Sequence, residues 1–234
     1  MREDGNMAAP RTRHNILLLD FIVPGLILLA GTILLRFSGW DLKVSSWFYL
    51  GNNKWWGQLN PFCNFMYYYG TIPALLLSII SLVILILSFF YHTLKKWRRN
   101  CIYLVLVMII GPGLLVNIVL KENWGRPRPR NIIYFGGNYV YEKPLEIDSS
   151  SPGKSFPSGH AAMGFYFFTL YFLVRGKRGK LTIWAFLFAV FYGLLMGFVR
   201  IAQGGHFLSD ILWSGGIIYL CSAFCYYLLK INQN

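Results

Sequence analysis

One short stretch near the C-terminal end of the sequence combines three side chains suited to nucleophilic chemistry. Residues 200–210 supply a guanidinium at Arg200, an imidazole at His206 and a carboxylate at Asp210. Asp210 follows His206 by four residues, so both lie on one face if a helix begins near His206. A carboxylate beside one ring nitrogen fixes the tautomer and leaves the other nitrogen free to attack. A guanidinium beside that imidazole suits a phosphoryl group better than a carbonyl group.

The same stretch, taken alone, is equally typical of the end of a membrane helix with one capped histidine and an unrelated arginine. Two other stretches favour the chemical interpretation. Residues 121–129 contain three cations, and residues 156–160 contain a second histidine directly after Pro-Ser-Gly. The elements between these stretches therefore have to bring them together.

The composition is that of a membrane protein. Hydrophobic residues make up 56% of the 234 residues and charged residues 13%, whereas a soluble domain has about 25% charged residues. The net charge of +13 could indicate a nucleic-acid partner. The basic residues, however, cluster at the ends of apolar runs or beside the candidate site. We therefore expect no nucleic-acid binding and a single membrane domain over residues 1–234, with its core motifs at 121–210.

Six apolar runs are each able to cross a bilayer, which takes about 20 residues as a helix. They cover residues 16–35, 71–91, 101–120, 159–174, 181–199 and 207–229. The first run is too long for the apolar part of a signal peptide and lacks a clear cleavage site, so we expect it to be retained. The predicted fold is an all-α bundle of six transmembrane helices.

The distribution of basic residues predicts the orientation of this bundle. With six spans, most lie on one side: Arg11, Arg13, Lys95, Lys96, Arg98, Arg99, Arg175, Lys177, Arg178, Lys180 and Lys230. The positive-inside rule then places both termini in the cytoplasm. The opposite side also carries basic residues, namely Lys121, Arg126, Arg128, Arg130 and Arg200. These break the rule, and anion binding explains them.

Two connections on the outer side differ in kind. Residues 37–70 are dense in tryptophan and tyrosine, which predicts a segment at the level of the lipid headgroups; it could also shape lipid entry. Residues 121–158 are long and polar, which favours a functional loop. The four cysteines form neither a disulfide framework nor a zinc motif, so we expect them to be packing residues.

Three spaced motifs now share one predicted face. They are Lys121 followed after six residues by Arg128-Pro129, then Pro157-Ser158-Gly159-His160, then Arg200, His206 and Asp210. This order resembles the signature of the type 2 phosphatidic acid phosphatase family, which soluble vanadium haloperoxidases and class A acid phosphatases share. The sequence is similar to the membrane branch, over roughly residues 111–234 by motif. One departure is Val199, where the family usually has serine before the arginine.

The resemblance implies a mechanism without metal or other cofactor. His206 would attack phosphorus and form a phosphohistidine, with Asp210 orienting it. His160 would protonate the leaving oxygen and then deprotonate the incoming water. Lys121, Arg128 and Arg200 would hold the phosphate oxygens, helped by Ser158 and the Gly159 N–H.

The functional roles of the other charged residues of the long loop are less clearly indicated by the sequence. Arg126 and Arg130 either contact the substrate headgroup or are solvated loop charges. Glu142, Glu146 and Asp148 have irregular spacing, so we expect a solvated face rather than a metal site.

The resemblance also implies a substrate class. Residues 111–129 and 203–210 look like the bacterial lipid A phosphatase branch, especially 4'-phosphatases, whose site would face the periplasm at the inner membrane. In that branch the second motif can deviate, whereas here it is intact. Removal of either the 4'- or the 1-phosphate of lipid A therefore stays open, as do undecaprenyl pyrophosphate and phosphatidylglycerophosphate as substrates.

Two alternatives come from other classes. A non-catalytic lipid-phosphate binder or transporter would need only the cations, so the two histidines and Asp210 argue against it. The six spans argue against a haloperoxidase. We expect the lipid substrate and the bilayer as partners, and no obligate protein partner.

Overall fold

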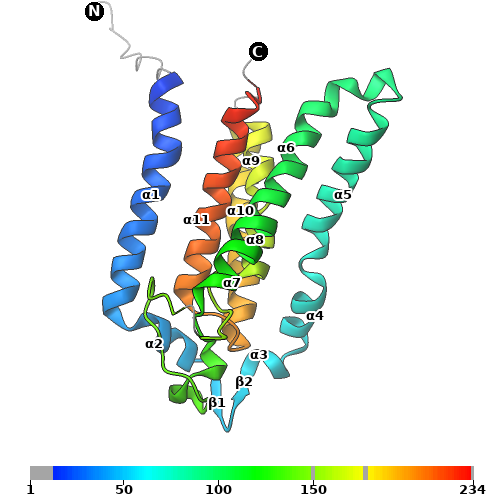
Figure 1. The fold of residues 1–234 in the computed structure, drawn as a ribbon. Helices are drawn as coiled ribbons and strands as arrows, with labels where there is room; N and C mark the ends of the chain where they lie inside the picture. Colours follow the sequence, from blue (N-terminus) through cyan, green and yellow to red (C-terminus); the bar gives the residue numbers. More distant parts are fainter. Residues whose placement is uncertain (1–12, 149–150, 176–178, 233–234) are drawn as a thin grey trace, which may run out of the picture.

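The apolar runs of the sequence form long helices that lie side by side (Figure 1). The computed structural model describes residues 13–148, 151–175 and 179–232. Within these residues, five helical segments are long and apolar enough to cross a membrane: Leu18–Ser38, Pro61–Leu87, His92–Trp124, Gly179–Ala202 and Leu208–Leu228. The remaining predicted span, Gly159–Val174, is a shorter apolar helix. The chain is thus a mostly helical protein with several membrane-length helices.

Most helix boundaries lie near the predicted ones. The first, fifth and sixth runs correspond to α1 (Arg13–Ser38), α10 (Gly179–Ala202) and α11 (Leu208–Leu228). The second run corresponds to α5 (Ile72–Leu87), but α4 (Pro61–Tyr69) precedes it directly and extends the apolar segment. The fourth run is divided into α8 (Gly159–Phe165) and α9 (Phe168–Val174).

The third span is the least regular. The 3₁₀-helix η1 (His92–Trp97) leads into α6 (Arg98–Met108), which continues as the π-helix η2 (Ile109–Leu120) and then as α7 (Lys121–Trp124). Pro112 inside η2 has no N–H to donate, so the α-helical hydrogen-bond pattern cannot continue there. The side chain of Asn117 donates to the Pro112 carbonyl (2.8 Å) and accepts from Lys121 Nζ (3.1 Å). The irregular segment thus carries the contact that places Lys121.

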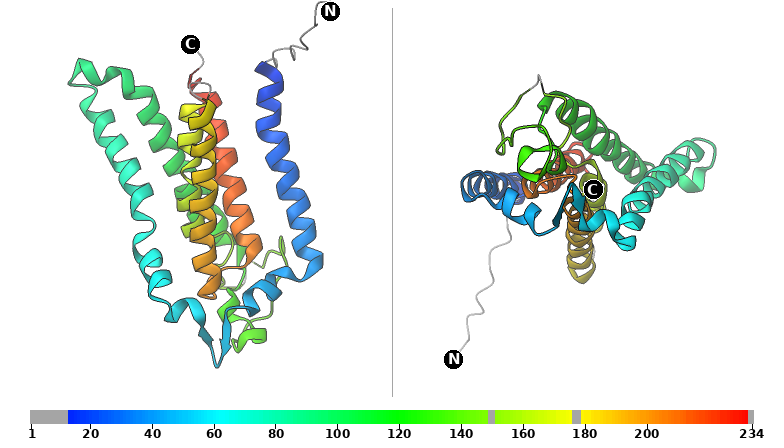
Figure 2. Two further views of the ribbon diagram at one scale, coloured as in Figure 1. Left: turned by 180° about the vertical axis from the view of Figure 1, so that it is seen from behind. Right: turned by 90° about the horizontal axis from the view of Figure 1, so that it is seen from below.

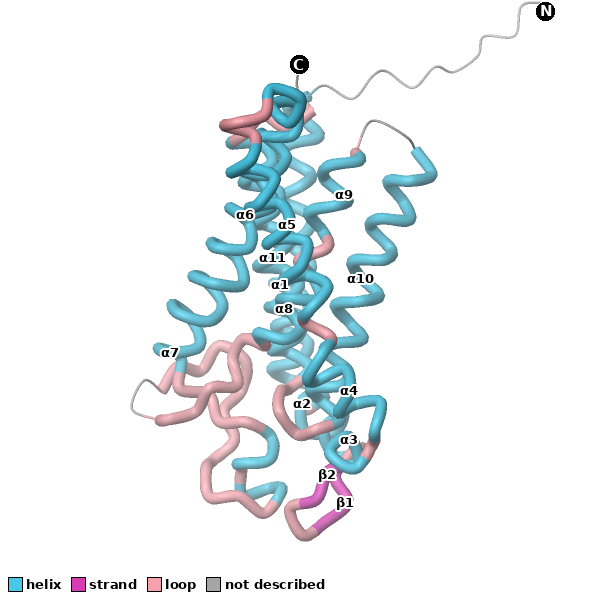
Figure 3. The backbone as a smooth tube through the Cα atoms, turned by 90° about the vertical axis from the view of Figure 1, so that its right-hand side faces the viewer, coloured by secondary structure: helices cyan, strands magenta, loops and turns pink. Residues whose placement is uncertain are grey.

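One end of the bundle is built from short elements and loops, which gather there in Figure 3. We call it the site end; it comprises residues 39–70, 125–148, 151–158 and 203–207. It contains α2 (Trp40–Ser46), an antiparallel hairpin of β1 (Tyr49–Gly51) and β2 (Lys54–Trp55), α3 (Trp56–Leu59), and the 3₁₀-turns η3 (Pro129–Asn131) and η4 (Ile133–Phe135). The hairpin is an element that the sequence did not predict.

The aromatic residues of the site end divide into two groups. Trp40 and Trp47 are 43% and 60% exposed, as an interfacial segment requires. Trp55 is fully buried and packs on Tyr49 and Phe135, with ring centroids 5.4 and 5.1 Å away. This second group ties the hairpin to the long polar loop, so the segment is more than a belt at the headgroup level.

The opposite end, here called the far end, holds the start of α1 and the end of α11 (Figures 1 and 2). The connection from α5 to α6, the end of α9 and the starts of α6 and α10 also lie there, and these parts carry Lys95, Lys96, Arg98, Arg99, Arg175 and Lys180. Of the predicted topology signals, Arg11, Lys177 and Arg178 lie outside the described residues. The basic connections and the site end are therefore at opposite ends of the bundle.

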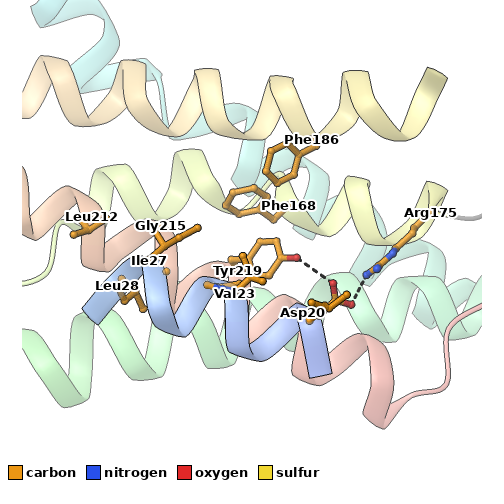
Figure 4. A pocket seen from close by; sticks show the side chains of 13 residues that line it. Asp20, Val23, Ile27, Leu28, Phe168, Arg175, Phe186, Leu212, Gly215 and Tyr219 are labelled. Carbon is orange, nitrogen blue, oxygen red and sulfur yellow. Dashed lines mark hydrogen bonds and ion pairs between the residues drawn. The ribbon is translucent and has the colours of Figure 1, made fainter. Parts of the chain in front are cut away.

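A mostly apolar pocket of about 540 Å³ lies between α1, α9, α10 and α11 (Figure 4). Leu28 and Leu212 line one part of it. Asp20 closes the other part, where it forms an ion pair with Arg175 and accepts a hydrogen bond from the Tyr219 hydroxyl. This charge pair joins α1 to the residue after α9, away from the site end.

Candidate active site

The loop between α10 and α11 holds His206. Gly204 has a φ of +64°, and a Cβ at this position would lie 2.3 Å from the Trp55 ring. Only glycine meets both conditions without strain. The Gly205 N–H donates to the Arg200 carbonyl (2.8 Å), which closes the turn. The Gly-Gly pair therefore returns the chain tightly, leaving His206 only 2% exposed.

The contacts of His206 define its tautomer. Its Nδ1 lies 2.6 Å from the Ser155 carbonyl oxygen and 3.5 Å from Asp210 Oδ2. A carbonyl oxygen only accepts, so Nδ1 carries the proton and Nε2 has the free lone pair. The closest partner of Nδ1 is thus the Ser155 carbonyl. The Asp210 carboxylate, which we expected to orient the ring, lies farther away. Sequence reasoning did not identify Ser155, whose carbonyl carries no signature in the sequence.

The charge state of His206 follows from its surroundings. Burial, with a smaller contribution from the Arg200 guanidinium, lowers the pKa of His206 to about 3, although Asp210 acts to raise it. The imidazole is therefore neutral at physiological pH, as a nucleophile requires.

Asp210 is fully buried in the first turn of α11. Its Oδ1 accepts from Arg126 Nη1 (2.6 Å). Its Oδ2 accepts from the Ser155 hydroxyl (2.6 Å) and the Phe207 N–H (2.8 Å). A carboxylate in the first turn also complements the helix dipole. Asp210 thereby links the start of α11 to the segment that holds His206.

Arg126 is not available to a headgroup, contrary to one of the two expectations for it. Its side chain is fully buried, and its guanidinium donates to Asp210, Asp41, Ser209 and the Glu142 carbonyl. Burial acts to lower its pKa, but the Asp210 and Asp41 carboxylates outweigh this, so the pKa lies above its ordinary value. Solvated loop charge, the other expectation, is also wrong, because this cation is an internal one.

The remaining cations converge on one region. Arg200 is 5% exposed, donates to Gln203 Oε1 (2.6 Å) and lies with its Cζ 4.7 Å from the Tyr67 ring centroid. Lys121 is close enough to Arg128 and Arg200 for mutual electrostatic repulsion. Burial, and then the neighbouring Arg130, lower the pKa of Arg128. Like charges held together in this way favour binding of an anion.

These three cations have unused hydrogen-bonding capacity. The Nε atoms of Arg128 and Arg200 are buried and have no hydrogen-bond partner. The salt bridges of the described residues involve none of Lys121, Arg128 and Arg200. Buried donors are normally paired, so unpaired ones mark a place where a ligand supplies the acceptor.

His160 lies at the start of α8 beside the same cations. Its Nε2 is 3.2 Å from the Tyr67 carbonyl oxygen, and its ring stacks on the Tyr67 ring with centroids 4.9 Å apart. Lys121, Arg128 and Arg200 are all close enough to act on it electrostatically. Tyr67 thus positions both His160 and Arg200, a role that the density of aromatic residues in its segment concealed.

Ser158 and Gly159 have distinct environments. The Ser158 hydroxyl caps its own helix by accepting from the Ala161 N–H (3.4 Å), and its N–H donates to Ser214 Oγ (2.9 Å). A Cβ added to Gly159 would lie 3.0 Å from Lys121 Nζ. Glycine at this position therefore allows the ammonium group to approach the start of α8.

Two pockets border these residues. One of about 330 Å³ is lined by Asn117, Lys121, Gly159 and His160 together with Thr71, Leu75 and Met163. Another, of about 250 Å³, is polar and includes Arg128, Asn131 and Lys154. The first extends from the cationic cluster toward the membrane-length helices, and the second lies among the loops of the site end.

The acidic residues of the long loop are only partly solvated. Asp148 is exposed, and Glu146 forms an ion pair with Arg36 (3.1 Å). Glu142 is half-buried, and one of its carboxyl oxygens is buried without a hydrogen-bond partner. Burial and then the nearby Asp148 raise its pKa to about 7. The expectation of a solvated face therefore holds for Asp148 and is wrong for Glu142.

The sequence is similar to known proteins over most of its length. Residues 100–233 match the model of the PAP2 superfamily. A lipid A 4'-phosphatase of Francisella tularensis subsp. novicida is 33% identical over 89% of this chain and 95% of that protein. A lipid A 4'-phosphatase of Rhizobium leguminosarum is 36% identical over 47% of this chain and 48% of its own length. Phosphatidylglycerophosphatase B of Bacillus subtilis is 33% identical over 53% of each chain. No solved structure matches.

The helical membrane fold, the cationic cluster and these relatives define a membrane lipid phosphatase, a phosphoric monoester hydrolase. The match covers more than half of the chain, and the Francisella relative aligns over nearly its full length. The chain belongs to the PAP2 superfamily.

Proposed function

We propose that this protein removes a phosphate from lipid A, at the 4'- or the 1-position, through a phosphohistidine intermediate. The observation that carries the proposal is a group of three cations, Lys121, Arg128 and Arg200, that form no salt bridge among the described residues. Lys121 and Arg200 act electrostatically on the neutral His206, whose Nε2 carries no proton, and all three act on His160. The full-length similarity to a protein named lipid A 4'-phosphatase supports the choice of substrate.

In the first half-reaction, His206 Nε2 attacks phosphorus and the bond from phosphorus to the sugar oxygen breaks. His160 gives its proton to the leaving oxygen. The Tyr67 carbonyl accepts from the Nε2–H of His160, so His160 has to be doubly protonated in the substrate complex, where the phosphate anion favours its positive charge, and the proton that it gives up is the one on Nδ1. Lys121, Arg128 and Arg200 offset the negative charge on the transferring phosphoryl group. Every proposed step uses side chains of this protein and no metal ion.

In the second half-reaction, His160 takes a proton from water, and the resulting hydroxide attacks phosphorus. The phosphorus–nitrogen bond breaks, which releases inorganic phosphate and restores the neutral His206. The Asp210 carboxylate, 3.5 Å from Nδ1, stabilises the positive charge that the ring carries while it is phosphorylated.

The pockets suit an amphipathic substrate. The pocket beside Lys121 and His160 has side chains from the membrane-length helices in its wall, so it can take the apolar part of a lipid near its phosphate. The polar pocket around Arg128 and Lys154 can take sugar hydroxyls. Arg130, half-buried beside Arg128, is a further candidate for headgroup contact.

We further propose that the site end faces the periplasm of a bacterial inner membrane, with both termini in the cytoplasm. The basic connections at the far end support this orientation through the positive-inside rule. Phosphatidylglycerophosphate is the second candidate substrate, because one relative carries the name phosphatidylglycerophosphatase B.

The test is phosphate release by the purified protein from lipid A, phosphatidylglycerophosphate and undecaprenyl pyrophosphate, each presented in mixed micelles. We expect lipid A to lose one phosphate, with tandem mass spectrometry assigning the position. His206→Ala should reduce release by at least about 10³-fold, as removal of a covalent nucleophile does, while its elution in size-exclusion chromatography stays unchanged. Turnover retained in that variant, or release only from the other two lipids, would overturn the respective part of the proposal.

A further inference from the structure

Asp41 is a buried carboxylate that no sequence motif indicates. It lies in α2, in the aromatic connection after the first span, and is fully buried. Its Oδ1 accepts from the Ser209 N–H (2.8 Å), and its Oδ2 accepts from the Ser209 hydroxyl (2.5 Å) and from Arg126 Nη2 (2.8 Å). Asp41 therefore contacts the first turn of the helix that carries Asp210, although it lies far away in the sequence.

Arg126 connects Asp41 to Asp210. One terminal nitrogen of its guanidinium bonds Asp41 and the other bonds Asp210 (2.6 Å). The remaining N–H groups donate to Ser209 Oγ and to the Glu142 carbonyl, and the guanidinium lies 4.5 Å from the Phe207 ring centroid. A planar guanidinium with every donor engaged has one orientation only.

The chain of contacts continues to the nucleophile. Asp210 Oδ2 accepts from the Ser155 hydroxyl (2.6 Å), and the carbonyl of the same serine accepts from His206 Nδ1 (2.6 Å). Each link from Asp41 to His206 is therefore a hydrogen bond of 2.8 Å or less. The two carboxylates and one guanidinium carry a net single negative charge, which remains beside the imidazole.

From these contacts we infer that Asp41 and Arg126 are positioning residues for the reaction, an inference that rests on the proposed function. They hold Asp210 and Ser155 in the arrangement that keeps the proton on His206 Nδ1 and aims Nε2 at the substrate. Both side chains are fully buried, so neither touches substrate. Their loss acts on the rate of the chemical step and leaves substrate binding unchanged.

The experiment compares Asp41→Asn with Asp20→Asn. Both substitutions remove the charge from a buried aspartate that is ion-paired with an arginine and bonded to hydroxyl groups, but Asp20 lies away from the site end. We expect both variants to lower the Tm in detergent. Asp41→Asn should also lower kcat at least 10-fold with KM within twofold, whereas Asp20→Asn should keep kcat within twofold. Arg126→Lys, which retains the charge, should recover part of the kcat that Arg126→Gln loses.

A second readout needs no substrate. The ¹⁵N chemical shifts of the His206 ring, assigned with His206→Ala, should show a single tautomer in the wild type and a mixture in Asp41→Asn. Asp20→Asn should leave them unchanged. If the wild type releases no lipid phosphate, the proposed function fails and these shifts still decide the positioning role. Unchanged shifts in Asp41→Asn, or a fall in kcat no larger than in Asp20→Asn, would overturn the inference.

Discussion

At the scale of single residues, the site depends on how His206 is kept neutral and oriented. The Ser155 carbonyl fixes the proton on Nδ1, and burial together with the cation at Arg200 disfavours a second proton. Asp210 is near enough to stabilise a charged ring without taking the shortest contact. For the proposed attack on phosphorus, no proton therefore has to leave His206 Nε2 first.

This arrangement predicts a pH response. A free histidine has a pKa of about 6.5, and His206 has a pKa of about 3 in the folded protein. Its ring ¹⁵N shifts should therefore stay those of the neutral Nδ1–H form from pH 8 down to pH 5. The chain has four histidines, so the assignment by substitution is short. A midpoint for His206 above pH 5 would contradict the prediction.

The same shift affects folding. Below about pH 6.5, His206 becomes protonated in the unfolded state but stays neutral in the folded state. The unfolded state therefore binds more protons than the folded state. The stability contributed by this site is thus full above pH 6.5 and falls as the pH drops toward 3. His206→Ala should flatten that part of the pH dependence of the Tm.

The side chains to which the proposed mechanism assigns the reaction could be selected from the sequence, because their chemistry appears in their types and spacing. Lys121 lies within electrostatic range of His160, His206, Asp210, Arg128 and Arg200, so the predicted residues gather in one region. The residues that position them were not predictable. Ser155 acts through a backbone carbonyl, and Tyr67 looks like any other ring of an interfacial segment. Arg126 was misjudged because its partner Asp41 lies 85 residues away.

At the scale of elements, the turn between α10 and α11 demands glycine for two separate reasons. Gly204 has both a left-handed backbone conformation and a ring directly against its Cα. Gly39 provides a matched control, because its φ is +68° and an added Cβ would meet nothing within 4 Å. The two positions therefore separate backbone strain from steric contact.

Gly39→Ala should cost about 1 kcal/mol of stability, the usual cost of a left-handed non-glycine residue. Gly204→Ala should cost about 1–3 kcal/mol more, because Trp55 has to shift within packed surroundings. Thermal unfolding in detergent measures both, and the activity of Gly204→Ala should fall as the His206 loop moves. Equal losses of Tm in the two variants would show that the Trp55 contact has no effect.

Hydrophobic runs predicted the long helices well, since burial in lipid requires such runs. The interruptions were less predictable. The division of the fourth run between α8 and α9 and the π-helix around Pro112 depend on packing against neighbouring helices. The hairpin β1–β2 is stabilised by burial of Trp55 against Phe135, which lies about 80 residues later in the long polar loop.

At the scale of the whole molecule, the proposed orientation makes a sharp prediction. All four cysteines are buried, so the wild type should react little with a membrane-impermeant maleimide. Lys54 in the hairpin and Lys95 at the far end are both exposed. In intact spheroplasts, Lys54→Cys should be labelled and Lys95→Cys should not, while both should be labelled after the membrane is opened. The reverse pattern would place the site end in the cytoplasm.

The first 99 residues lie outside the part of the chain that matches the family model. They nevertheless supply Asp41 to the start of α11, Tyr67 to His160 and Trp55 to the turn before His206. A chimera that took its first two spans from a distant relative would keep the proposed reactive side chains. It would lose the contacts from the first 99 residues that hold those side chains in place. Compatibility between the halves, tested by exchanging them among homologues, should therefore limit how freely such enzymes recombine.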